Sequence, residues 1–542
     1  MSFDIQNISR IKDEFPQKRD CFSELMDYLK SDNPHKICAL YGLRRTGKTV
    51  LMQQALLNLP ESEKQKADFI TCNFTTDFHE VLAFIQSEIE KGKKYFFIDE
   101  ITYAKGFQEI GEILSDNFVS FQDARIVVTG TDSLGLSLPS HSILYDRIKM
   151  IHTSYMSFAE FSRVTGNKSI DYYLKHGSTL SNISPFENYS SANEYIESSI
   201  VENFIRSLEK SEGIRSYPPV LTELYESKDL ENAIQRIINQ YSQNITLRAL
   251  RKQFELSPLK NGINAFSRRK ENTDFEIKDT LKIEFIESNV KKLLKIDDST
   301  SKIKEDDFEK IKNFLKEMDV ITCIPVMTSL NGKSGAPDME LITHPGMYHA
   351  NLGYTIEQLK KDDNWLSGAT FEQKDMLLKS VYEATAGKIQ ENFIIADVYK
   401  MLAARNEGVS DFDYVRQSRW YVSKLSTEVE GKTEEVDLIV ADRKKKETFL
   451  FEIKHSTKVV KEQSAHLESN PFLEYIESKF GKVKERIVLY NGKTDVLLKV
   501  PRINISDFLQ DMYKYSKNKE YSIGETTRWL VSRVKNEIER GR

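Results

Sequence analysis

The chain has 542 residues, 39% of them hydrophobic and 29% charged, and this length predicts three or four domains. The formal net charge of −5 excludes a chain-wide basic field for nucleic acid, so any such surface must be a local patch. The four cysteines lack Cys-x-x-Cys spacing, which predicts reduced thiols. No apolar leader and no run of about 20 apolar residues are present, which predicts a cytoplasmic protein without membrane contact.

The first predicted element is a short apolar strand, residues 36–41, followed by a glycine-rich loop and a helix. The loop, residues 42–49, reads G-L-R-R-T-G-K-T, a pattern whose backbone N–H groups wrap the phosphates of a nucleotide. We expect Lys48 to reach the β- and γ-phosphates and Thr49 to ligate Mg²⁺. The predicted nucleotide-binding residues of this segment are Gly42, Leu43, Arg44, Arg45, Thr46, Gly47, Lys48, Thr49 and Val50.

The two arginines inside the loop, Arg44 and Arg45, are unusual for this pattern. They contact phosphate or a neighbouring subunit in one interpretation, and in the other they are solvated loop charges. The sequence favours the solvated charges.

Two further buried strands are predicted, at residues 93–101 and 124–133. The first ends in Asp99, expected to hold the Mg²⁺ shell, and Glu100, expected to polarise the attacking water. The second ends in hydroxyls, of which Thr129 or Thr131 would sense the γ-phosphate, unless these hydroxyls only cap the strand. Together the strands predict a doubly wound α/β P-loop NTPase core with its ligands at the carboxyl ends of the strands.

A single arginine follows in the stretch "YDRIKMIHTSYMSFAEF". Arg147 is a candidate catalytic residue, as a γ-phosphate sensor or as an arginine that acts on a neighbouring subunit of a homo-oligomer. A surface salt bridge is the alternative.

The loop, "FFIDEI", "VVTGTDS" and this last stretch together resemble the prokaryotic AAA-type ATPases. In that family an arginine precedes a segment like "PLSFxEF". Arg147 and residues 156–161 hold those places here, and Tyr155 replaces the proline. The resemblance implies ATP and Mg²⁺ as cofactors. It also implies a winged-helix-like middle segment and a C-terminal domain similar to PD-(D/E)xK nucleases.

The segment after the predicted core has helical spacing. Residues 189–211 predict a lid or linker helix. Residues 244–266 predict two helices around a turn at Ser257–Pro258, and residues 308–326 predict a helix followed by a short strand. This order suits a winged helix, with residues 268–307 as an insertion.

The function of that middle module has two interpretations. Arg248, Arg251 or Lys252 would contact DNA in the first. In the second, which we favour, the module only joins two domains.

Near the C-terminus, two apolar strands, residues 436–440 and 448–453, flank a polar turn. If Val440 pairs with Phe449, Asp437 lies opposite Glu452, and Lys454 points to the same face. Facing carboxylates repel unless a cation joins them. In a PD-(D/E)xK arrangement they hold Mg²⁺, and the lysine orients the water or stabilises negative charge.

An upstream acid is available on an amphipathic helix, residues 387–402. The resemblance matches its Glu391 to a "G-x-x-x-E-N-F" helix whose glutamate completes the metal site. The alternative for this region is an inert scaffold with a solvated charged face. The predicted catalytic residues of the chain are Glu100, Arg147, Glu391, Asp437, Glu452 and Lys454, and the predicted metal ligands are Thr49, Asp99, Asp437 and Glu452.

The predicted fold is an α/β multidomain protein. Its expected parts are an AAA-type P-loop core at 1–160, a helical lid at 161–228, a winged-helix-like domain with an insertion at 229–350, an α/β restriction-endonuclease-like domain at 351–512 and a C-terminal docking helix at 513–542.

The expected function is an ATP-driven switch coupled to a Mg²⁺-dependent nuclease-like domain that acts on DNA, in defence or mobile-element biology. A binding switch with an inert nuclease-like domain is the alternative. A small-molecule phosphotransferase is less favoured, because Glu100 suits hydrolysis better.

Overall fold

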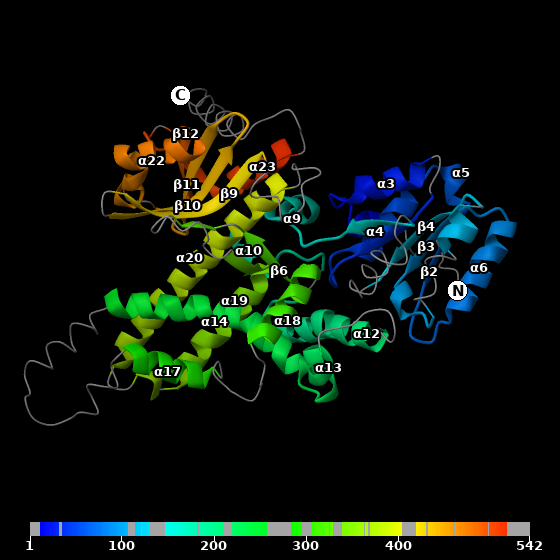
Figure 1. Cartoon of the computed structure of the whole chain (residues 1–542), viewed down its shortest axis with the longest axis horizontal. Coiled ribbons are helices and arrows are strands. Elements are labelled where there is room, and N and C mark those ends of the chain that lie inside the picture. The colour runs from blue at the N-terminus through cyan, green and yellow to red at the C-terminus, as the bar shows by residue number, and fades with distance from the viewer. Residues whose placement is uncertain are drawn as a thin grey trace, which may run out of the picture.

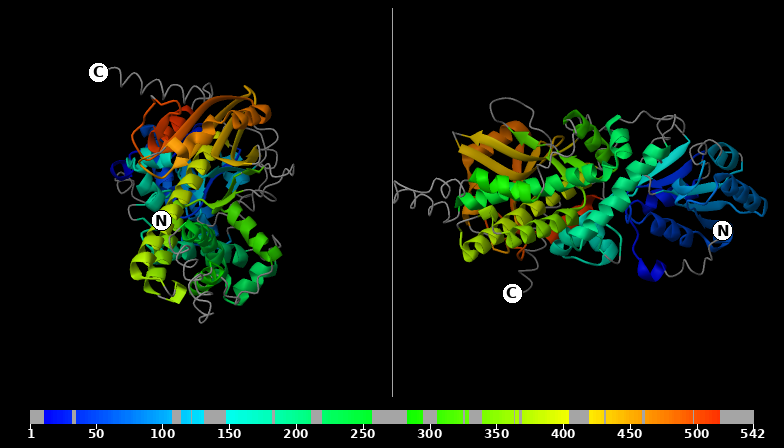
Figure 2. Two further views of the ribbon diagram at one scale, coloured as in Figure 1. Left: turned by 90° about the vertical axis from the view of Figure 1, so that its left-hand side faces the viewer. Right: turned by 90° about the horizontal axis from the view of Figure 1, so that it is seen from below.

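The computed structural model arranges the described residues as two large β-sheets joined by a mainly helical region that contains a further two-stranded sheet, with the N-terminal sheet at one end (Figures 1 and 2). Among the residues that it describes, no helix is long and apolar enough to cross a membrane. The described residues are 11–31, 35–106, 114–120, 122–130, 147–181, 184–210, 219–256, 283–294, 305–324, 326–328, 339–362, 364–366, 369–403, 419–429, 432–458, 461–496 and 498–516.

The N-terminal sheet is parallel and has the strand order β2-β3-β4-β1-β5. Its strands are β1 (Ile37–Tyr41), β2 (Ala67–Thr71), β3 (Tyr95–Asp99), β4 (Arg125–Thr129) and β5 (Ile148–His152). Strands β1, β3 and β4 are the three that the sequence predicts. Around them lie α2 (Ile11–Glu14), α3 (Phe22–Lys30), α4 (Lys48–Leu57), α5 (Glu61–Lys64), α6 (Phe78–Glu90), η1 (Ile101–Tyr103) and η3 (Leu114–Ser120).

Both faces of this sheet are buried, as a doubly wound core requires. Ile37 and Ala39 of β1 join a hydrophobic cluster that includes residues of α6. Cys38 and Leu40 point the other way and join a cluster that includes residues of α3 and α4. The alternation follows from the two-residue period of a strand, and it confirms the parallel P-loop type of α/β core.

After β5 the chain is mainly helical. The predicted lid at residues 189–211 corresponds to three successive helical elements, α11, η4 and α12. The helices of the region are α9 (Phe158–Thr165), α10 (Ile170–His176), α11 (Tyr189–Tyr195), η4 (Ile196–Val201), α12 (Glu202–Lys210), α13 (Pro219–Glu226), α14 (Leu230–Leu256), α17 (Ile283–Leu293), α18 (Glu305–Glu317), α19 (Pro345–Lys361), η6 (Asn364–Leu366) and α20 (Phe371–Ala403).

The predicted helix-turn-helix is described only in part. Its first helix is the C-terminal half of α14, a single helix of 27 residues, and its turn and second helix fall at residues outside the described ones. Arg251 on α14 pairs with Glu287 of α17 at 2.6 Å, a contact that joins two helices. The helix and strand predicted at residues 308–326 are α18 and β6 (Ile321–Ile324), and β6 pairs antiparallel with β8 (Met339–Ile342).

The C-terminal sheet is mixed and has the order β13-β12-β11-β10-β9-β7. Val440 pairs with Phe449 in the antiparallel β10–β11 hairpin, which is the predicted register. The elements are β7 (Val326–Thr328), β9 (Trp420–Val429), β10 (Lys432–Asp442), β11 (Glu447–Lys454), η7 (Lys461–Glu468), α22 (Asn470–Phe480), β12 (Lys482–Tyr490), β13 (Arg502–Asn504) and α23 (Ile505–Ser516). The predicted docking helix lies almost wholly outside the described residues, and its first residues belong to α23.

Helices cover both faces of this sheet (Figure 1). Phe449 and Phe451 of β11 join one large buried cluster with Phe393 of α20, and that cluster continues to Ile234 of α14 and Phe158 of α9. On the other face, a separate cluster joins the sheet to α22. The middle helices and the C-terminal sheet therefore share one hydrophobic core.

Candidate functional site

The phosphate loop, residues 42–49, connects β1 to α4 at the carboxyl end of the sheet. Gly42 has a φ of 143°, and a Cβ there would lie 2.5 Å from the carbonyl oxygen of Thr153. Gly47 has a φ of 90°, a value that L side chains rarely adopt. Both glycines are therefore required by the backbone path, and the loop rests directly on the segment that follows β5.

Lys48 begins α4 and is almost fully buried. Its Nζ donates hydrogen bonds to the carbonyl oxygens of Gly42 and Leu43, at 2.8 and 2.9 Å. Burial lowers the pKa of Lys48 to about 8, although the nearby Glu100 and Asp99 carboxylates oppose this. A bound polyphosphate would favour the charged ammonium, because an anion stabilises the protonated form.

Two carboxylates end β3 beside the loop, as predicted. Asp99 accepts hydrogen bonds from the hydroxyls of Thr49, at 2.9 Å, and Thr129, at 2.5 Å. The Thr129 hydroxyl also accepts one from the backbone N–H of Glu100 at 3.0 Å. Burial raises the pKa of Asp99, and the Thr129 hydrogen bond opposes that rise. Thr129 thus lies at the carboxylates, and Thr131, the other sensor candidate, lies outside the described residues.

Replacing Glu100 with glutamine should slow ATP turnover without weakening ATP binding. The amide keeps the shape of the side chain but cannot take a proton from water. The loss of a general base lowers rates by about a hundredfold or more. Steady-state phosphate release and calorimetric ATP affinity, measured on the same preparation, check this. Unchanged phosphate release would assign the base to another residue.

Arg147 lies at the opposite end of the sheet from the phosphate loop. Its carbonyl accepts from Ile37 N at the start of β1, whereas the loop follows Tyr41 at the end of that strand. Its guanidinium is 3.1 Å from the Asp116 carboxylate. The sensor role within one chain is therefore wrong for this structure, and the predicted salt bridge is present. Action on a neighbouring subunit stays a prediction.

The helices after β5 contact the loop arginines. The backbone N–H of Arg44 donates to Ser199 Oγ at 3.1 Å, and Tyr195 Oη donates to the Arg44 carbonyl at 3.0 Å. A surface pocket of about 670 Å³ beside the loop is lined by Arg44, Arg45 and Arg206 and by four glutamates within residues 187–202. In this chain the loop arginines thus line a pocket of mixed charge.

The second predicted site assembles in the C-terminal sheet. Asp437 lies where a β-bulge shifts the β9–β10 register, a device that redirects side chains. Lys454 contacts Glu452 and lies 3.9 Å from Asp437. Glu391 of α20 joins the cluster through Lys424 of β9, which is 2.7 Å from Glu391 and 3.7 Å from Asp437. The structure thus brings together all four residues that the sequence predicts for this site.

Three basic side chains of this cluster were missed by the sequence analysis. They are Lys388, Lys424 and His466. Lys388 and Lys424 both contact Glu391, and His466 Nε2 is 3.2 Å from Glu452. Lys388 precedes Glu391 by one helical turn, so helix geometry could have placed it. The other two have no local signal, because their elements meet the hairpin only through the sheet topology.

The acids of the cluster strongly affect one another. Burial, Glu391 and Glu452 together raise the pKa of Asp437 to about 7. Burial also opposes the ionised form of Glu391, but Lys388 and Lys424 lower its pKa below the usual value. Among the described residues, no group of three or more His, Cys, Asp or Glu side chains is arranged to hold a metal ion. Lysines, rather than direct carboxylate contacts, connect the acids here.

Helix α20 carries Glu391 of one candidate site and contacts the segment against which the phosphate loop rests. Glu391 belongs to the acid cluster, and further along the helix Asp397 accepts a 2.7 Å hydrogen bond from the backbone N–H of Phe158, at the start of α9. Lys400 donates to Ser154 Oγ at 2.9 Å. The preceding residue, Thr153, is hydrogen-bonded to Thr46 of the phosphate loop at 3.0 Å. The loop and the acid cluster are therefore connected by a short chain of buried contacts.

The stability of the protein should depend on pH through Asp397. Burial raises its pKa to about 7. Folding then favours the protonated acid, so this contribution is full below about pH 4 and is lost as pH rises through about 7. Each unit of pKa difference between folded and unfolded chain corresponds to about 1.4 kcal/mol. In Asp397→Asn, the free energy of unfolding measured in urea should fall less steeply between pH 4 and 8 than in wild type. An unchanged dependence on pH would show that Asp397 is not the group responsible.

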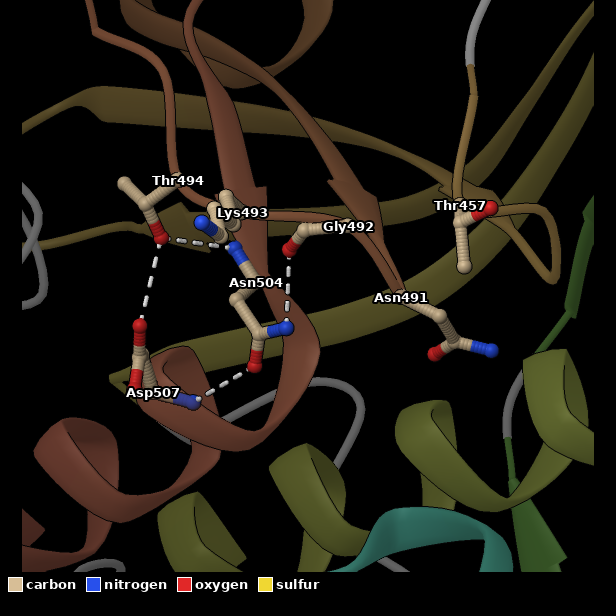
Figure 3. A pocket seen from close by; sticks show the side chains of 7 residues that line it. All are labelled: Thr457, Asn491, Gly492, Lys493, Thr494, Asn504 and Asp507. Carbon is tan, nitrogen blue, oxygen red and sulfur yellow. Dashed lines mark hydrogen bonds between the residues drawn. The ribbon is translucent and has the colours of Figure 1, made fainter.

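A second pocket, of about 640 Å³, lies where β11, β12 and β13 end (Figure 3). Asn504 Nδ2 donates to the Gly492 carbonyl at 2.8 Å, and Thr494 Oγ1 donates to Asp507 at 3.2 Å. Asn491, set apart in Figure 3, donates to Gln390 Oε1, beside Glu391, at 3.0 Å. The lining is completed by Thr457 and Lys493. Much of this polar lining is therefore engaged in hydrogen bonds within the protein.

Comparisons with known proteins match part of the chain. An uncharacterized protein of Haemophilus influenzae is 29% identical over 134 residues, which are 23% of this chain and 32% of that relative. The chain thus spans about a third of the length of the curated relative that it matches. The family model described as "AAA domain" matches residues 34–162, the parallel sheet with its phosphate loop. This match supports an AAA-type ATPase domain, which implies nucleotide binding.

Proposed function

We propose that the chain is an ATP-hydrolysing switch coupled to a Mg²⁺-dependent nuclease-like domain that acts on DNA. The AAA domain match supports the ATPase part. The observation that carries the nuclease part is the convergence of Glu391, Asp437, Glu452 and Lys454, from one helix and two strands, on one cluster. A role in defence or mobile-element biology would suit this pairing.

The nucleotide part would use the residues around the loop. Backbone N–H groups of residues 42–49 and the Lys48 ammonium would hold the phosphates. Thr49 and Asp99, already hydrogen-bonded to each other, would hold Mg²⁺. Glu100 would accept a proton from the attacking water, and Thr129 would keep both acids in place. A homo-oligomer would additionally let Arg147 act on a neighbouring chain.

The residues of the C-terminal cluster fit a hard cation. The Glu452 carboxylate is largely buried, with its Oε2 3.2 Å from His466 Nε2, and Asp437 is crowded by two other carboxylates. Mg²⁺ prefers oxygen ligands and retains several waters, so two carboxylates are enough to hold it. When bound, it would supply Lewis-acid stabilisation of a phosphodiester. Lys454 would orient the attacking water or stabilise the developing charge on the phosphate.

We propose the same domains that the sequence predicts, but with three of them grouped into one structural unit. The lid, the winged-helix-like middle and the nuclease-like sheet would act as one body, because they share a continuous core. The ATPase core would act on that body through α9 and α20.

A binding switch with an inert nuclease-like domain is the second candidate. The favouring observation is that each acid of the cluster already contacts a lysine, as in a structural ion-pair network. Such a protein would hydrolyse ATP to change shape and hold a DNA or protein partner without cleaving it.

One assay separates the two functions. Purified protein is incubated with supercoiled plasmid or single-stranded DNA and Mg²⁺, with and without ATP. The proposed function predicts cleavage that EDTA stops and ATP changes in rate. ATP hydrolysis without cleavage of either DNA would favour the binding switch.

A further inference from the structure

Lys424 holds a position between two acids that come from different elements. Its Nζ is 2.7 Å from Glu391 Oε1 on α20 and 3.7 Å from Asp437 Oδ1 on β10. The three side chains are between 13% and 17% exposed, so water screens these charges only weakly. On β9, Lys424 lies opposite the bulge that contains Asp437, so the same irregularity places both side chains.

When all three acids are ionised, the charges of the cluster balance without a metal. Among the described residues, the carboxylates of Glu391, Asp437 and Glu452 contact three ammonium groups, those of Lys388, Lys424 and Lys454. His466 adds another positive charge when it is protonated. A divalent cation added to this set would leave two uncompensated positive charges in a mostly buried site, which is unfavourable. Metal binding therefore requires that a lysine leave the acids.

Lys424 and Lys454 each contact oxygens of two acids, but Lys424 is the one that joins the acid of the helix to an acid of the hairpin. Among the described acids, Lys388 pairs with Glu391, and Lys454 pairs with the two hairpin acids, Glu452 and Asp437. Lys424 connects Glu391 to Asp437, the two acids that a cation shared by helix and hairpin would have to join.

We propose that Lys424 is an internal counter-cation that occupies the metal position between Glu391 and Asp437 and must be displaced when a divalent cation binds. This inference rests on the proposed function, because it assumes that the cluster takes a metal. Lys424 is then a positioning residue that keeps the acids together in the metal-free protein and weakens their affinity for the ion.

The test is calorimetric titration of the full chain with Mn²⁺, without nucleotide. Lys424→Gln removes the charge but can still donate a hydrogen bond to Glu391. It should tighten Mn²⁺ binding by about tenfold, since the ion no longer competes with the ammonium. Lys424→Arg keeps the charge and should bind Mn²⁺ no more tightly than wild type. Lys484→Gln is the matched control, because Lys484 pairs with Glu447 at the far end of β11.

The outcomes separate the inference from the proposed function. Equal or weaker Mn²⁺ binding by Lys424→Gln, with measurable binding by wild type, would overturn the inference and leave the metal site standing. Tighter binding by Lys424→Arg would overturn it too, even if Lys424→Gln does not fold. Absence of Mn²⁺ binding in wild type and in folded Lys424→Gln would overturn both.

Discussion

Replacing Lys48 with alanine should abolish tight ATP binding and leave the chain folded. The ammonium would face the β- and γ-phosphates, and without nucleotide it donates hydrogen bonds to two loop carbonyls. Losing those two bonds costs about 1–3 kcal/mol, whereas losing the charge facing the phosphates removes most of the affinity. Isothermal calorimetry with ATP and circular dichroism measure the two effects separately.

The matched control for this substitution is Lys64→Ala, a lysine of the same domain that pairs with Glu61 on a short surface helix. It should bind ATP as the wild type does. Wild-type affinity in Lys48→Ala would show that the phosphate loop is not the nucleotide site.

Replacing Asp437 or Glu452 with alanine should abolish DNA cleavage and spare ATP hydrolysis. Each acid would hold the metal, and the phosphate loop lies in the other sheet, so the ATPase chemistry should survive. Lys454→Ala should also stop cleavage but still permit metal binding, since the ammonium is not a ligand. Cleavage, phosphate release and Mn²⁺ affinity measured on each variant distinguish these roles.

Glu435→Ala is the control for the acids, because Glu435 lies two residues before Asp437 on β10 and is exposed. It should cleave DNA and hydrolyse ATP at wild-type rates. Full cleavage by Asp437→Ala would move the metal ligands elsewhere, and joint loss of both activities would point to misfolding or to direct coupling of the two sites.

The elements that the sequence predicts well are those whose signal is local. The phosphate loop lies between a buried strand and a helix, and strand periodicity alone places Asp437 opposite Glu452 once Val440 pairs with Phe449. Glu391 came from the family resemblance, and the structure brings it to the same cluster.

What the sequence could not place depends on contacts between distant elements. Arg147 follows the third predicted strand in sequence and directly precedes β5. Because β5 runs parallel to β1, Arg147 lies at the amino end of the sheet, away from the phosphates. Lys424 and His466 reach the acids only because β9 and η7 meet the hairpin in the folded sheet. Asp397 reads as an ordinary helix residue until α9 packs against it.

Thermal unfolding without nucleotide tests the central claim, a divalent-metal site at the C-terminal carboxylates, most directly, because it requires no knowledge of the substrate. Wild type, Asp437→Ala and Glu452→Ala are heated in EDTA and in millimolar Mn²⁺ or Mg²⁺. A ligand that binds only the folded state raises the midpoint. We expect a metal-induced rise of the unfolding midpoint in wild type that vanishes in both variants. An equal rise in all three proteins, or no rise in wild type, would contradict it.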